Sequence, residues 1–137
     1  MGASLRLRLL RGGGAALMTL GLVHLVATPH IATLIRRSTT APVAEWLTPP
    51  MLLNHVLVGA LLIPLGYLTV YAAPQAVRGA PWAQRIVRTV SVSAAWLPIA
   101  LFSLMRQPYF LDAPLFVLGA ALTVVAVVAL LAAAFSG

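Results

Sequence analysis

Three histidines carry the most informative chemistry in this sequence. His24, His30 and His55 each fall within a long apolar run. An ionisable side chain is costly to bury in lipid, so a histidine at such a position is a candidate functional residue. A neutral imidazole binds haem iron, copper or zinc, and two facing histidines on neighbouring helices can hold a b-type haem. We therefore interpret all three histidines as candidate cofactor ligands.

Two properties decide which of these histidines can bind the same ligand: their depth below the membrane interface and the helical face on which each one lies. If the second apolar helix begins at Pro50, His30 and His55 both lie roughly 7 Å below one membrane interface, and His24 lies about 9 Å deeper. His24 and His55, in contrast, share the helical faces that carry small residues. No pair therefore combines equal depth with a common face. The alternative is that each imidazole makes a structural hydrogen bond to a neighbouring helix.

A copper site would draw on two methionines near the same interface. Met51 and Met105 lie at the corresponding ends of their apolar runs, and thioether sulfur suits Cu(I). With His30 and His55 they form a candidate metal site, whose spacing matches no recognised metal motif. Asn54, beside His55, can donate and accept hydrogen bonds between helices, which predicts a structural role.

The remaining residues argue against most catalytic chemistry. The chain has no cysteine, which excludes thiolate metal sites, disulfides and iron–sulfur clusters. It has no HExxH motif, and its two acids, Glu45 and Asp112, lie outside the apolar runs. This composition disfavours hydrolysis and proton-coupled transport, and it favours a non-catalytic protein over an enzyme.

Four apolar segments must position these residues. Hydrophobic residues make up 61% of the 137 residues and charged ones only 8%, whereas a soluble domain has about 25% charged residues. Crossing the hydrocarbon core takes about 20 apolar residues, and the segments long enough are 12–35, 51–73, 86–105 and 114–135. The connections, 36–50, 74–85 and 106–113, are too short for a further domain. We predict an all-α, four-helix transmembrane bundle that forms one domain over residues 1–137.

The arginines predict the orientation of this bundle. All nine basic residues are arginine, and cytoplasmic loops of membrane proteins carry the excess of positive charge. An N-in/C-in arrangement places six of them inside, namely Arg6, Arg8, Arg11, Arg78, Arg85 and Arg88. It places three outside, namely Arg36, Arg37 and Arg106. Because these arginines border apolar runs and form no continuous stripe, we expect the lipid bilayer as their partner and no nucleic acid.

Small residues and prolines indicate how the helices pack. Gly59, Gly66 and Ala73 recur every seven residues, as do Gly14, Gly21 and Thr28, which predicts two close-packing helical faces. Prolines lie inside three of the four segments, at Pro29, Pro64 and Pro98. Each can bend its helix, which predicts a bent bundle or a cavity opened at the bends.

Three functions are compatible with these features. The first is an accessory or assembly subunit of a larger membrane complex, or a homo-oligomer. The second is a redox protein that binds haem b or copper through His55 with His24 or His30. The third is a lipid or quinone site in a cavity lined by His24, His55 and Trp96. The usage of Ala, Arg, Val and Leu resembles that of small bacterial membrane proteins from high-GC genomes, which predicts a multi-pass protein of the bacterial inner membrane.

Overall fold

Four long helices make up almost all of the described chain. The computed structural model describes residues 1–105 and 114–136, and over these it contains α1 (Ala3–Ser38), α2 (Ala41–Val77), α3 (Pro81–Leu104) and α5 (Pro114–Ala134). All four are long and apolar enough to cross a membrane. The prediction of an all-α, multi-pass membrane protein is therefore confirmed.

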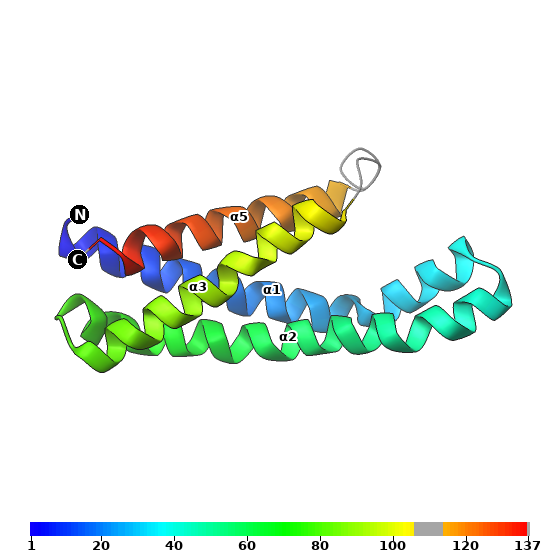
Figure 1. The fold of residues 1–137 in the computed structure, drawn as a ribbon, viewed down its shortest axis with the longest axis horizontal. Helices are drawn as coiled ribbons and strands as arrows, with labels where there is room; N and C mark the ends of the chain where they lie inside the picture. Colours follow the sequence, from blue (N-terminus) through cyan, green and yellow to red (C-terminus); the bar gives the residue numbers. More distant parts are fainter. Residues whose placement is uncertain (106–113, 137) are drawn as a thin grey trace.

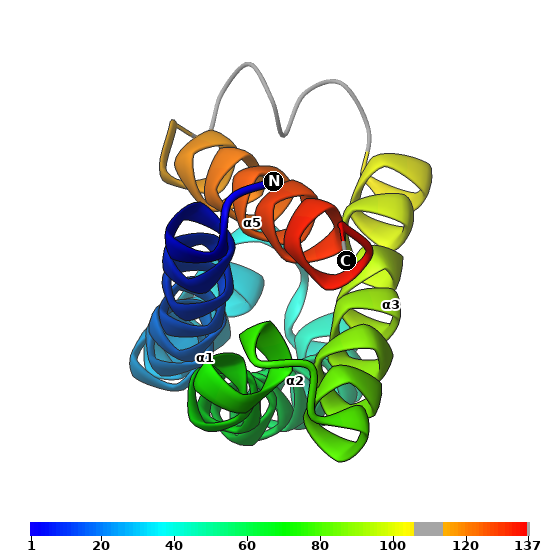
Figure 2. The same cartoon turned by 90° about the vertical axis from the view of Figure 1, so that its left-hand side faces the viewer.

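The helices form a ring in which each one packs against two neighbours. The substantial contacts join α1 to α2, α2 to α3, α3 to α5 and α5 back to α1 (Figure 2). Both chain ends lie at the same end of the bundle (Figure 1), so successive helices run in opposite directions. This up-and-down topology is the one that short connections favour.

The connections are shorter than predicted, because the helices extend beyond the apolar segments. The predicted connection 36–50 is wrong, since α1 continues to Ser38 and α2 starts at Ala41 with a proline in its first turn. Proline suits this position because its missing N–H needs no partner there. The predicted connection 74–85 shrinks to residues 78–80, where Gly79 adopts a φ of 90° that favours glycine. The third connection, 106–113, with Arg106 and Asp112, lies outside the described residues.

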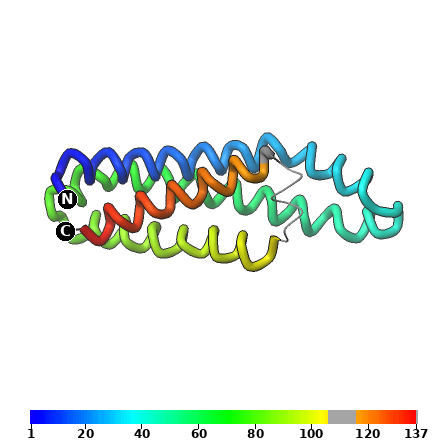
Figure 3. The backbone as a smooth tube through the Cα atoms, turned by 90° about the horizontal axis from the view of Figure 1, so that it is seen from above, coloured from blue at the N-terminus to red at the C-terminus, as the bar shows by residue number. Residues whose placement is uncertain are grey.

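The hairpin of α1 and α2 extends beyond the other two helices (Figure 3). α1 has 36 residues and α2 has 37, against 24 in α3 and 21 in α5. At 1.5 Å per residue, α1 is about 54 Å long and α5 about 32 Å, and only the latter matches a hydrocarbon core of about 30 Å. Gly13 lies against Ala126 and Leu130, and antiparallel counting from there places the start of α5 opposite about residue 27 of α1. We call residues 28–52 the projecting hairpin.

Two arginines bind the carboxyl end of α5, at the end of the bundle opposite the projecting hairpin. Arg6 of α1 donates from Nε to the carbonyl oxygen of Ala133 at 2.9 Å, and Arg88 of α3 donates to that of Ala134 at 3.4 Å. The Arg88 guanidinium also lies 5.7 Å from the centre of the Phe135 ring. The last turn of α5 has no basic residue of its own. Its neighbours therefore supply the positive charge that complements the helix dipole.

The absence of cysteine makes the orientation directly testable. We expect Thr40→Cys to react with a membrane-impermeant maleimide in intact cells, and Ser4→Cys to react only after permeabilisation. Both positions are exposed and lie at opposite ends of the bundle. The reason is the excess of arginine at the end that carries Ser4. Labelling of Ser4→Cys in intact cells, with protection of Thr40→Cys, would reverse the N-in/C-in assignment.

Candidate functional site

Close contacts between glycines set the register of α1 against α2. A Cβ atom added at Gly21 would lie 2.8 Å from the carbonyl oxygen of Gly59, and one added at Gly59 would lie 2.8 Å from that of Gly21. Gly14 and Gly66 make the equivalent contact two turns away. The residue numbers of each pair add to 80, which places the reversal of the chain at about residue 40, beside the turn at Thr39 and Thr40. The same counting brings His24 level with residue 56.

His24 and His55 consequently lie side by side. Their ring centres are 4.6 Å apart and their planes are inclined by 39°. The predicted difference in depth between these two histidines is wrong. It followed from starting the second helix at Pro50, whereas α2 begins nine residues earlier and the chain turns at residues 39–40. The pair therefore combines the common face and the equal depth that no pair was predicted to combine.

The predicted partner His30 is placed elsewhere. It is exposed, and it lies in the projecting hairpin about 9 Å further along α1 than His24. Met51, Met105 and Asn54 are also exposed, and Met51 has 52% of its surface accessible. Within residues 1–105 and 114–136, no three His, Cys, Asp or Glu side chains lie close enough together to bind one metal ion. Among the predicted histidine ligands, the structure thus brings together His24 and His55 and leaves His30 apart.

Hydrogen bonding leaves a ring nitrogen of each histidine available. His24 Nδ1 lies 2.8 Å from the carbonyl oxygen of Leu20. A carbonyl can only accept, so Nδ1 carries a proton, and in the neutral ring the lone pair then lies on Nε2. His55 Nε2 is buried and has no hydrogen-bond partner among the described residues. A buried polar atom without a partner typically costs about 1–3 kcal/mol, and such an atom calls for a functional explanation.

A small cavity adjoins His24 between the four helices. It has a volume of about 90 Å³, and all four helices contribute to its lining, which consists of Leu20, His24, Val58, Leu62, Leu97, Leu101 and Thr123. Thr123 uses its hydroxyl to donate to the Gly119 carbonyl. A site for a drug-sized organic ligand occupies about 300–1,000 Å³, so this space suits water or a small ion and not a quinone.

The predicted cavity differs in its lining from the observed one. His24 lines it, but His55 does not, and Trp96 is 67% exposed on α3. The interior prolines do not line it either, since Pro29 and Pro64 are exposed on their helices and Pro98 is half-buried. The interior prolines therefore do not open this space.

A haem does not fit between the two histidines. With metal–nitrogen bonds of about 2.0–2.1 Å, two imidazoles on opposite sides of one ion have ring centres about 6 Å apart. The observed centres are 4.6 Å apart, so a haem would need both a separation of about 1.5 Å and room for its porphyrin plane between the rings. The backbones of α1 and α2 also touch at Gly21 and Gly59, within four residues of both histidines, so no slot for a porphyrin exists there.

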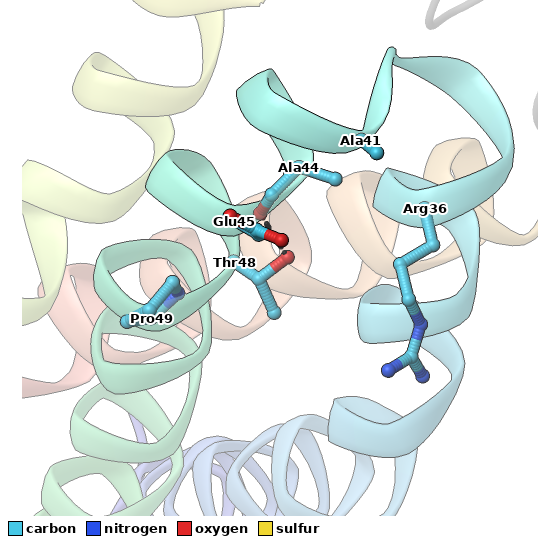
Figure 4. A pocket seen from close by; sticks show the side chains of 6 residues that line it. All are labelled: Arg36, Ala41, Ala44, Glu45, Thr48 and Pro49. Carbon is cyan, nitrogen blue, oxygen red and sulfur yellow. Dashed lines mark hydrogen bonds between the residues drawn. The ribbon is translucent and has the colours of Figure 1, made fainter.

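A second hollow lies in the projecting hairpin (Figure 4). It is an open groove of about 490 Å³ between the end of α1 and the start of α2, lined by Arg36, Ala41, Ala44, Glu45, Thr48 and Pro49. Arg36 enters it from α1, and Glu45 enters it from α2 (Figure 4). Thr48 donates to the carbonyl oxygen of Ala44 at 2.6 Å. The groove therefore presents one positive and one negative side chain beside small apolar ones.

Comparison with known proteins adds no assignment to these sites. No protein family, curated protein or solved structure matches this chain. The chemistry of the histidine pair and of the hairpin groove is therefore inferred from their own geometry.

Proposed function

We propose that this protein is a non-catalytic subunit of a larger membrane assembly in the bacterial inner membrane. The projecting hairpin is the part that contacts the partner, either another membrane subunit or a second copy of the chain. The observation that supports this proposal is the set of large apolar side chains that the hairpin exposes beyond α3 and α5, namely Leu34, Val43, Trp46, Leu47 and Met51.

The length of the hairpin explains why these side chains need a protein partner. The tip of α1 at Ser38 lies about 16 Å beyond the level at which α5 begins. At that distance α3 and α5 do not cover it (Figure 3), and a bilayer matched to the shorter helices supplies no hydrocarbon. Contiguous apolar surface exposed outside lipid marks an interaction site. Trp46 is 85% exposed, and tryptophan is among the residue types most enriched at the centres of interfaces.

The groove adds specificity to this surface. Arg36 and Glu45 offer opposite charges within the same hollow, and Ala41 and Ala44 leave room for a side chain of the partner. Complementary charges steer association and reject wrong partners. An apolar anchor beside a charged groove is therefore a reasonable docking surface for one defined partner.

Removing the tryptophan anchor tests the proposal. After extraction in mild detergent, we expect the native protein to run as a particle heavier than the 14.4 kDa chain. Trp46→Ala should weaken this assembly at least about tenfold, because truncating a central anchor typically costs about 2 kcal/mol or more. Native mass spectrometry measures the mass of the particle and the fraction of the protein that remains assembled.

Trp96→Ala is the matched control, because Trp96 is also exposed but lies on α3, within the length of a membrane span. It should leave the assembly intact. A native protein that is strictly monomeric would contradict the proposal, and so would equal weakening by the two tryptophan substitutions.

A further inference from the structure

We propose that His24 and His55 together bind one monovalent copper ion, with one imidazole nitrogen from each ring. The inference is independent of the docking function, because both histidines lie outside the projecting hairpin. It rests on the adjacency of the two rings, on the hydrogen-bonding state of each and on the distance of Glu45, the one acid among the described residues.

Both rings present a nitrogen that is ready for a metal. The bond from His24 Nδ1 to the Leu20 carbonyl fixes the tautomer whose Nε2 lone pair points away from the backbone. Metal-binding histidines commonly donate their other N–H to a backbone carbonyl in this way, which orients the ring. Thr28 in turn donates to the carbonyl oxygen of His24 at 2.9 Å. His55 Nε2, which is buried and has no hydrogen-bond partner in the part of the chain that the structure describes, supplies the second ligand.

The spacing of the rings suits a single small ion. Two imidazoles on opposite sides of one ion have centres about 6 Å apart when metal–nitrogen bonds are about 2.0 Å long. The observed 4.6 Å reaches this linear arrangement after side-chain rotation moves the rings apart by about 1.5 Å. The glycine contacts hold both backbones in place during such a rotation, so α1 and α2 need not separate.

The charge of the surroundings selects a monovalent ion. Two neutral imidazoles cancel none of the charge of the metal, and the one acid among the described residues, Glu45, lies ten positions before His55, about 15 Å along α2. A divalent ion would therefore keep its full charge where water is scarce, at a large cost in desolvation. Copper(I) carries half that charge, and imidazole is a suitable ligand for copper.

The test uses the full-length protein in detergent, free of air, titrated with Cu(I) against a chromophoric Cu(I) chelator. We expect one ion per chain for the native protein. His24→Ala and His55→Ala should each weaken binding by about 100-fold or more, since even the loss of an outer-shell partner of a metal ligand costs about 10–100-fold. His30→Ala is the matched control and should retain native affinity, because His30 is exposed and distant from the pair.

Two further measurements test the site on the native protein, so their outcome does not depend on whether the alanine variants fold. X-ray absorption of the copper-loaded native protein should show two nitrogen neighbours at about 2 Å and no sulfur; a sulfur neighbour would overturn the assignment in favour of methionine. Zn²⁺ offered in the same assay should not be retained, and equal retention would overturn the argument from charge. Native copper affinity in both His24→Ala and His55→Ala would overturn the site itself.

Discussion

Replacing Gly66 by alanine is expected to lower the free energy of unfolding by about 2–3 kcal/mol, at the upper part of the usual range for an overpacked contact. A Cβ atom at this position would overlap the carbonyl oxygen of Gly14, and it would lie 2.9 Å from the backbone nitrogen of Met18. Both are backbone atoms, which cannot rotate away as a side chain can. The only relief is to move α1 and α2 apart, which weakens the largest contact in the ring. Reversible unfolding in mixed detergent, followed by tryptophan fluorescence, measures the loss.

Gly12→Ala provides the matched control for this substitution. Gly12 also lies within a helix, but nothing lies within 4 Å of an added Cβ atom there. Alanine at an unhindered helical position is expected to stabilise by about 0.5–1 kcal/mol, because glycine loses more backbone freedom on folding. If Gly66→Ala and Gly12→Ala change stability equally, the close approach of the two helices is not what holds the hairpin together.

Replacing Arg6 by methionine is expected to cost about 2 kcal/mol of stability, since hydrogen bonds to charged groups contribute about 1.5–3 kcal/mol. Arg6 is only 7% exposed, and its Nε donates to the carbonyl oxygen of Ala133. Methionine preserves much of the apolar stem but removes the donor, so this carbonyl loses its partner. The end of α5 also loses a charge that favours its dipole. The same unfolding measurement applies.

Arg8→Met removes the same charge from the same helix and serves as the control. Arg8 is exposed, and surface substitutions of this kind usually change stability by less than about 0.5 kcal/mol. Because both variants lose one positive charge at the same end of the bundle, they alter the orientation signal equally. A similar loss of stability in the two variants would show that the buried contact of Arg6 does not anchor α5.

Apolar length alone was enough to predict the four helices, but it did not predict where they end. The segment 36–50 contains charged residues and the adjacent Pro49 and Pro50, a pattern that favours a connection over a helix. In the structure α2 runs through both prolines, because its first turns pack against the end of α1 and bury Ala32 and Ala44. Tertiary packing of this kind overrides local propensity. It is invisible until the partner segment is known.

The contact between His24 and His55 could have been predicted from the sequence. Both seven-residue repeats of small residues were recognisable, at Gly14 and Gly21 and at Gly59 and Gly66. If the two repeats are placed against each other in opposite directions, the register follows, the turn falls at residue 40, and His24 meets His55. The contact between Arg6 and Ala133 was not predictable in this way, since it joins residues 127 positions apart and no sequence pattern marks it.

The ring of helices also implies an order of events during synthesis. α1 and α2 are joined by a two-residue turn and pack directly on each other, so they can enter the bilayer as a pair while the ribosome is still translating α3. Arg6 precedes Ala133 by 127 positions, so it lacks this acceptor until α5 has been made. Of the four helices, α5 therefore docks last, and until it docks the Arg6 guanidinium has no buried carbonyl to bind.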